Sequence, residues 1–354
     1  MKEEKKTKTI KLPIILSITI SVASIIIISY LFFGEDTVNE LVSIKIKYEF
    51  FIVALSVNIV YWILWGLRLK ILANAIDKNL NLGIWKATRI VIANLFLANI
   101  TPSMAGGEPV RIYLLNKDGL SYGSATAAVL AERLLDAIFL LICVPFAFLI
   151  FSKYLNDPIY VVILFLAIMV FIVAIIFFGL AIKYPKKIKS FLIYINKKIR
   201  KITKKEDVKK SYMDKIIKDV DDFHDSMIFY LTKGKYSLFK AGVTTAIFWI
   251  VGWTVPILIL LGLGLPPHII ESCAAQVMVI IIVMMPTTPG GAGVTETGVG
   301  FLYKAFIPGS LVAIFVILFR IATYYVGLIA GAIFQYRIFK SIASFSLDTI
   351  KKQD

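Results

Sequence analysis

The chain has 354 residues, of which 58% are hydrophobic and only 18% are charged, and its formal net charge at pH 7 is +16. Globular domains contain about 45–50% apolar residues, and so few charges could not cover this much apolar surface in water. The composition therefore excludes a soluble globular protein and a disordered chain. It predicts an all-α polytopic membrane protein, with a single transmembrane domain over residues 1–354.

The cysteines and histidines offer little for a metal or disulfide site. Cys143 and Cys273 lie in separate apolar stretches, and His224 and His268 are far apart in the sequence. This spacing matches neither a disulfide framework nor the ligand set of a zinc or haem site. We expect no metal and no other cofactor.

Six apolar runs are long enough to cross a bilayer, which takes about 20 helical residues. The first run holds no charge over 21 residues and no cleavage site follows it, so we interpret it as a retained signal anchor. The last run contains one charge, that of Arg320. The predicted spans are 13–33, 50–67, 135–152, 158–182, 241–262 and 310–333.

Basic residues predict the orientation, because cytoplasmic loops carry an excess of Lys and Arg. The loop 183–240 holds 17 Lys and Arg against 7 Asp and Glu, a net charge of +10. Both ends of the chain and the segment around Arg68 are also basic, whereas 34–40 and 154–158 are acidic or neutral. We therefore place both termini and the loop 183–240 in the cytoplasm of a prokaryotic cell, with the chain in its plasma membrane.

Two further apolar regions, 84–133 and 268–307, are broken by Gly and Pro clusters that one continuous helix cannot pass. With both termini cytoplasmic, the region 84–133 must enter and leave on the cytoplasmic side, and the region 268–307 on the outside. Two re-entrant broken helices of opposite orientation are typical of an inverted-repeat transporter. We predict a first half over 13–182 and a second half over 241–336, joined by the basic loop 183–240.

The two breaks resemble each other in sequence. The first reads Thr-Pro-Ser-Met-Ala-Gly-Gly-Glu from Thr101, and the second reads Thr-Pro-Gly-Gly-Ala-Gly-Val-Thr-Glu from Thr288. A helix that begins at such a break presents free N–H groups and a positive dipole end, which suit a phosphate or a carboxylate. The alternative is that both breaks are turns that only pack the bundle.

Ionisable residues accompany the breaks. A charge in mid-membrane costs at least about 2.5 kcal/mol, so it normally faces a cavity or a partner. Glu132 and Asp136 share one helix face, and Arg133 neighbours Asp136 at i, i+3. This group could carry protons, bind a cation or form a static ion-pair network. The candidate residues of this kind are Glu108, Arg111, Glu132, Arg133, Asp136, Glu296 and Arg320.

Arg320 lies ten residues into its span, and its surroundings are uncharged. Its guanidinium could bind a lipid phosphate bidentately, or it could pair with Glu108 or Glu296. The predicted substrate-binding residues are Gly106, Gly107, Glu108, Arg111, Glu132, Arg133, Asp136, Pro289, Gly290, Gly291, Gly293, Glu296, Arg320 and Tyr324.

Within the basic loop, apolar residues from Met213 to Leu231 recur every three to four positions, which predicts an amphipathic helix. This helix could lie on an anionic leaflet or pack against the cytoplasmic ends of the bundle. We do not expect nucleic-acid binding, because lysines commonly flank membrane spans and no recognition motif is present.

Four motifs occur in a characteristic order. They are Gly106-Gly107-Glu108-x-x-Arg111, Glu132-Arg133-x-x-Asp136, Pro289-Gly290-Gly291-x-Gly293-x-x-Glu296, and Arg320 followed by Thr323-Tyr324. Together they resemble the transmembrane region of lysylphosphatidylglycerol synthases, a family of flippase-like membrane proteins, and the resemblance covers nearly the whole chain. In bifunctional relatives this region is held to move an aminoacylated phospholipid between leaflets, and a separate soluble domain makes that lipid. The resemblance implies a role in lipid translocation for these residues.

The chain departs from those bifunctional relatives. Its largest polar stretch, 183–240, has 58 residues, below the usual size of a domain, about 100–150. Gly291-x-Gly293 lacks the Lys-Ser/Thr of a P-loop. We therefore expect a lipid translocator that moves a phosphate-bearing head group without ATP hydrolysis, rather than an enzyme.

The alternative is a membrane-embedded partner of a lipid-modifying transferase, similar to lysylphosphatidylglycerol synthase or to a polyprenyl-phosphate glycosyltransferase. The expected partners are membrane lipids, a soluble or membrane transferase and, in a homodimer, a second copy of the chain.

Overall fold

The computed structural model describes residues 45–101, 106–153, 210–283, Thr288 and 290–336, with scattered positions between 19 and 30 and between 165 and 190. Within these residues the secondary structure is helical, and four helices are long and apolar enough to cross a membrane. They are α3 (Tyr48–Ile76), α6 (Tyr122–Phe151), α10 (Lys235–Gly262) and the helix Gly309–Tyr336, whose first part is α13 (Gly309–Arg320). These four confirm the predicted spans that begin near residues 50, 135, 241 and 310.

The other spans and the membrane orientation stay predictions. Most of the spans 13–33 and 158–182 falls outside the described residues, and so do the segments 34–40 and 154–158 and the basic C-terminal end. The chain is an integral membrane protein with several apolar helices, as its composition requires.

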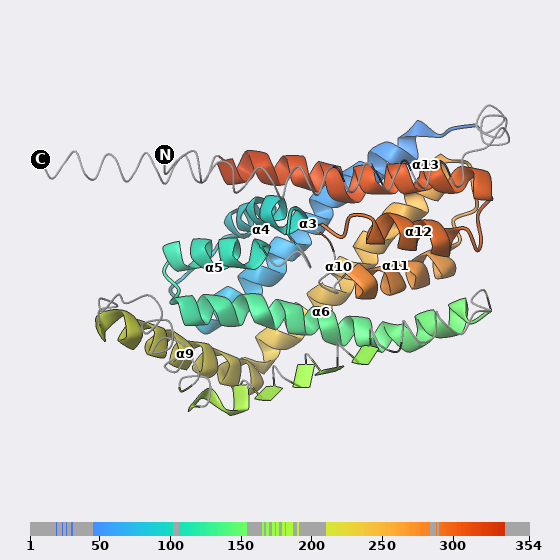
Figure 1. Cartoon of the computed structure of the whole chain (residues 1–354). Coiled ribbons are helices and arrows are strands. Elements are labelled where there is room, and N and C mark those ends of the chain that lie inside the picture. Colours follow the sequence, from blue (N-terminus) through green and yellow to red (C-terminus); the bar gives the residue numbers. More distant parts are fainter. Residues whose placement is uncertain are drawn as a thin grey trace, which may run out of the picture.

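The described helices follow the same order twice. A long helix, a helical hairpin and a second long helix occur as α3, α4 (Ile84–Asn99), α5 (Gly107–Lys117) and α6. The same order recurs as α10, α11 (Ile269–Val283), α12 (Val294–Tyr303) and α13. Figure 1 shows α4 and α5 on one side of the bundle and α11 and α12 on the other, while α3 and α10 slant between α13 and α6. The membrane topology of the two predicted halves stays a prediction.

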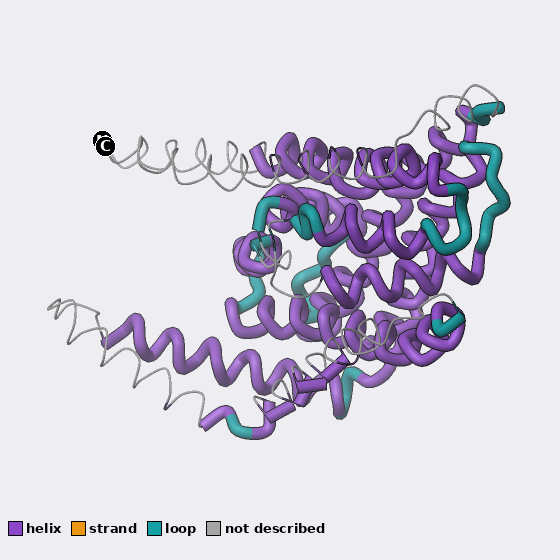
Figure 2. The backbone as a smooth tube through the Cα atoms, turned by 45° about the vertical axis from the view of Figure 1, so that its right-hand side comes forward, coloured by secondary structure: helices purple, strands orange, loops and turns teal. Residues whose placement is uncertain are grey.

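The halves interlock through their long helices and hairpins. The helix α3 packs along α10, while α4 packs on α3 and α11 packs on α6 of the opposite half. In the view of Figure 2, helices enclose short loop segments in the interior of the bundle. The four long helices thus form a frame that holds the two breaks inside.

The first hairpin turns at the predicted break that begins at Thr101. Thr101 ends α4 by donating its hydroxyl to the Leu97 carbonyl at 2.7 Å, and the same oxygen accepts the Gly106 N–H at 2.8 Å. Gly107 begins α5 against the side chain of Asn94, where a Cβ atom would collide. The hairpin therefore needs a small residue at its second glycine, which allows α4 and α5 to approach closely.

The hairpin is shorter than the predicted region 84–133. It ends with α5 at Lys117, and residues 122–133 form the first turns of α6, which begins at Tyr122. Ser121 caps α6 by accepting the Ser124 N–H at 3.2 Å. The prediction was wrong here because it ended an apolar run at a charge, whereas Glu132 and Arg133 are paired within the bundle and interrupt no helix.

The second hairpin turns through glycines in the left-handed region. Gly290, Gly291 and Gly293 have φ angles of 61°, 65° and 84°, which L-residues with a side chain rarely adopt. Glu296 then caps α12, because its Oε2 accepts the Gly293 N–H at 2.8 Å. This cap gives Glu296 a structural role in addition to the one predicted from its charge.

The tips of the two hairpins meet inside the bundle. The Gly290 N–H donates to the Thr101 carbonyl at 3.2 Å, and the Tyr324 hydroxyl donates to the Asn99 carbonyl at the same distance. Backbone groups that the breaks release from helical hydrogen bonds are thus satisfied by the other half of the protein.

The amphipathic helix of the basic loop is α9 (Lys210–Leu231). It packs on the start of α6, where the hydroxyls of Ser226 and Ser124 lie 3.0 Å apart. Tyr230 is buried and donates its hydroxyl to the Leu72 carbonyl of α3 at 2.8 Å. Of the two placements that the sequence left open, these contacts are those of a helix packed on the bundle.

Candidate functional site

The core of the bundle contains an ion-pair network centred on Arg68 of α3. The Arg68 Nη1 lies 2.5 Å from Asp136 Oδ1, and its Nε lies 3.1 Å from Glu132 Oε1. Its Nη2 donates to Asp136 Oδ2 at 3.3 Å. Because Glu132 and Asp136 are one turn apart on α6, a single guanidinium bridges both carboxylates.

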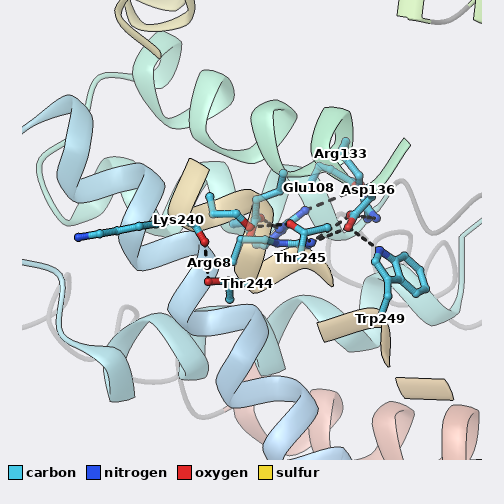
Figure 3. Close-up of polar contacts among 11 residues, drawn as sticks. Arg68, Glu108, Arg133, Asp136, Lys240, Thr244, Thr245 and Trp249 are labelled. Atoms are coloured by element: carbon cyan, nitrogen blue, oxygen red, sulfur yellow. Dashed lines mark hydrogen bonds and ion pairs between the residues drawn. The ribbon is translucent and has the colours of Figure 1, made fainter. Parts of the chain in front are cut away.

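The hairpin α4–α5 adds two more arginine–carboxylate contacts. Arg111 of α5 pairs with the second oxygen of Glu132. Arg133 donates from Nε and Nη2 to Glu108 Oε1 at 2.8 and 2.5 Å. Figure 3 shows Arg68 beneath α6, with Arg133 and Asp136 together at one end of the group. Three helices therefore share one continuous network.

The helix α10 covers this network with one polar and two aromatic residues. Thr245 Oγ1 accepts from Arg68 Nη1 at 3.3 Å, and the Trp249 indole N–H donates to Asp136 Oδ1 at 2.9 Å. The Cζ of Arg68 lies 4.7 Å from the ring centroid of Phe248, a cation–π contact. The second half of the protein thus contributes directly to the charged centre of the first.

The network is electrically balanced, with three arginines and three carboxylates: Arg68, Arg111, Arg133, Glu108, Glu132 and Asp136. Four of these side chains are almost completely buried. Buried charges cost several kcal/mol each in desolvation unless they are paired and hydrogen-bonded. The pairing of these charges ties α3, α5, α6 and α10 together, although Glu108 Oε2 and the Nε and Nη2 of Arg111 are buried without a hydrogen-bond partner among the described residues.

A second buried pair lies in the other half. Arg320 Nε is 2.9 Å from Glu296 Oε1, and the Arg320 Cζ lies 4.0 Å from the ring centroid of Tyr324. The helix changes here to a π-helical turn, η1 (Ile321–Tyr325), a distortion that occurs often at functional sites. Of the two pairings that the sequence left open for Arg320, the structure shows the one with Glu296.

A cavity of about 230 Å³ lies between the two charged groups. Among the described residues, its charged lining consists of Arg68, Arg133, Asp136 and Arg320. The tip residues Asn99 and Gly290 also line it. Its remaining walls combine aliphatic and a few polar residues with the aromatic side chains of Tyr61, Trp62, Trp65, Phe248, Trp249, Trp253, Phe319 and Tyr324. Both halves of the protein and both hairpin tips therefore contribute to one internal chamber.

The predicted site residues divide by position. Arg133, Asp136, Gly290, Arg320 and Tyr324 line the cavity. The others form ion pairs in the two charged groups or shape the hairpin turns. They are Gly106, Gly107, Glu108, Arg111, Glu132, Gly291, Gly293 and Glu296. Pro289 is outside the part of the chain that the structure describes.

Arg68 is the functional candidate that the sequence interpretation missed. It follows an uncharged run directly, so it was assigned to the cytoplasmic flank of a span, yet it is only 1% exposed. The apolar residues that follow Arg68 could have indicated its burial, because Leu69 and Leu72 continue the buried face of α3. The lining residues Asn58 and Trp249 were missed as well, because neither carries a charge or a motif.

The sequence matches the family described as "Lysylphosphatidylglycerol synthase TM region" over residues 14–331. The chain therefore belongs to this family. The match spans both halves and every part of the site described above. It confirms the resemblance that the four motifs indicated.

Three similar proteins carry the name UPF0104 membrane protein. One from Archaeoglobus fulgidus is 28% identical over 82% of this chain and 87% of its own length. One from Pyrococcus horikoshii is 24% identical over 94% of this chain and 99% of its own length. One from Methanocaldococcus jannaschii is 29% identical over 80% of this chain and 82% of its own length. No solved structure matches this member of the lysylphosphatidylglycerol synthase TM region family significantly.

Proposed function

We propose that the protein is a lipid translocator, which moves a phosphate-bearing head group between leaflets without hydrolysing ATP. The observation that carries this proposal is the internal cavity between the two hairpin tips, with three arginines in its lining. A guanidinium presents a fork of N–H donors that matches a phosphate.

The size of the cavity supports this role. Sites for drug-sized ligands measure roughly 300–1,000 Å³, so a cavity of about 230 Å³ suits a head group better than a whole two-chain lipid. The tails then stay in the bilayer, where the outward faces of α3 and α6 expose apolar residues such as Ile52 and Phe146. The head group then crosses the membrane inside the protein while the acyl chains stay in the surrounding bilayer, so the lipid never has to leave the membrane.

The hairpin tips supply a means of alternating access. Among the described residues, one backbone hydrogen bond joins them directly, from Gly290 to Thr101. Broken helices at the midplane between two repeats are typical of transporters that rock one repeat against the other. Opening at the tips would connect the cavity to one side of the membrane, and the lipid gradient or the membrane potential would set the direction.

The test is head-group scrambling in proteoliposomes that contain tail-labelled fluorescent phospholipids and receive dithionite from outside. We expect the wild-type protein to expose more than the outer-leaflet half of the label. Arg320→Gln combined with Glu296→Gln should slow this at least tenfold, because it removes the Arg320 charge without leaving a buried carboxylate unpaired.

The matched control is Arg89→Gln, since Arg89 is an exposed arginine of α4 outside the cavity lining. It should retain the wild-type rate. A flat trace with every lipid, from folded wild-type protein, would contradict translocation and favour the role of a partner to a lipid-modifying transferase.

A further inference from the structure

Positive charges outnumber negative charges in the cavity lining, although the two kinds balance in the ion pairs of the bundle interior. Among the residues that the structure describes, the lining contains the three arginines Arg68, Arg133 and Arg320 but only one carboxylate, Asp136. Glu132 and Glu296 do not belong to the lining; both pair with arginines and are completely buried. A ligand in the cavity therefore meets guanidinium groups first.

The carboxylate in the lining already accepts three hydrogen bonds from the protein. Asp136 Oδ1 accepts from Arg68 Nη1 and from the Trp249 indole, and Oδ2 accepts from Arg68 Nη2. The Oδ2 atom also lies 4.0 Å from Arg133 Nη1. The charge of Asp136 is thus paired with that of Arg68, which weakens its attraction for an ammonium group on a ligand.

Three of the aromatic rings in the walls are also occupied. An aromatic cage can bind an ammonium through cation–π contacts, but here the rings of Phe248, Trp65 and Tyr324 lie under the guanidinium groups of Arg68, Arg111 and Arg320. The distances from Cζ to the ring centroid are 4.7, 5.2 and 4.0 Å. These rings already have cations of the protein as partners.

Donors, in contrast, are in excess. Arg133 uses Nε and Nη2 on Glu108, and its Nη1 makes no hydrogen bond to a described residue. The indole nitrogens of Trp65 and Trp253, two residues of the lining, are buried without an acceptor in the described part of the chain. Buried donors without acceptors are costly, and an anion supplies the acceptors that they lack.

We propose that the cavity selects head groups of net negative charge, and that Arg133 is the residue that recognises this charge. The inference rests on the proposed function and narrows its substrate class. Phosphatidylglycerol or a polyprenyl phosphate fits this class, whereas zwitterionic and aminoacylated head groups do not, although the family is described by a lysylated lipid.

Binding is measured first, because it does not depend on transport. Purified protein in detergent is titrated with dihexanoyl phosphatidylglycerol and with dihexanoyl phosphatidylcholine, with tryptophan fluorescence as the readout. We expect phosphatidylglycerol to bind at least tenfold more tightly. Arg133→Gln should remove that preference, and Arg133→Lys should restore part of it, because lysine keeps the charge but loses the fork. Arg89→Gln should behave as the wild type.

Scrambling of tail-labelled phosphatidylglycerol, phosphatidylcholine and lysylphosphatidylglycerol then separates the two proposals. Transport of phosphatidylglycerol at least tenfold faster than of the other two lipids supports both. Equal or faster transport of lysylphosphatidylglycerol would overturn the selectivity and leave translocation standing. Selective binding without any transport would support the anion site and overturn the translocator. Equal binding of both short-chain lipids would overturn the anion site.

Discussion

Replacing Glu132 with alanine should lower the free energy of unfolding by about 3–5 kcal/mol. Glu132 is completely buried and pairs with Arg68 through one oxygen and with Arg111 through the other. Its loss leaves two buried guanidinium groups without their shared partner, and α3, α5 and α6 lose the contact that joins them. We expect the largest destabilisation of any single carboxylate here.

Denaturant unfolding of the purified protein in mixed micelles measures this effect. Glu49→Ala is the matched control, because Glu49 is an exposed carboxylate of α3, and its change should stay within about 0.5 kcal/mol. Glu132→Gln should fall between the two, since an amide keeps the shape and one acceptor. If Glu132→Ala and Glu49→Ala unfold alike, the network does not stabilise the bundle.

Gly290→Val should destabilise the protein by at least about 2 kcal/mol, because strained backbone alone costs about 1–3 kcal/mol. Gly290 has a φ of 61°, where a β-branched residue is an outlier. A Cβ atom there would also collide with the Asn99 carbonyl and would lie 2.6 Å from the Tyr324 ring. The substitution therefore forces the two hairpin tips apart.

The control for this prediction is Gly309→Ala at the start of α13, where an added Cβ atom meets nothing within 4 Å. Alanine favours a helix over glycine by roughly 0.5–1 kcal/mol, so this variant should be neutral or slightly more stable. Thermal unfolding of both variants in the same detergent compares them. A Gly290→Val protein as stable as the wild type would mean that the tips do not meet as described.

Much of the architecture was predictable because it depends on local chemistry. The apolar runs predicted the four long helices, and the Gly and Pro clusters predicted both hairpins at the places where they turn. The helical spacing of Glu132 and Asp136 correctly placed both carboxylates on one face, where Arg68 now binds them.

The pairing of residues from distant helices was not predictable. Arg68 meets its carboxylates across more than 60 positions of sequence, and Thr245 and Trp249 join them from the other half. No periodicity within one helix encodes such a contact, since it depends on how α3, α6 and α10 pack. For the same reason the sequence left both placements of α9 open, until its contacts with α6 decided between them.

The most direct test of whether a lipid head group enters the cavity is photolabelling. Phosphatidylglycerol and phosphatidylethanolamine, each with a diazirine on the head group, are reconstituted with the wild-type protein and irradiated, and the labelled peptides are identified by mass spectrometry. The account predicts that the phosphatidylglycerol probe forms adducts on α10 around Trp249 and Trp253, or at Tyr324, all residues of the cavity lining, and that the zwitterionic phosphatidylethanolamine probe labels them less. Labelling confined to outward-facing residues such as Ile52 and Phe146, with both lipids, would contradict it.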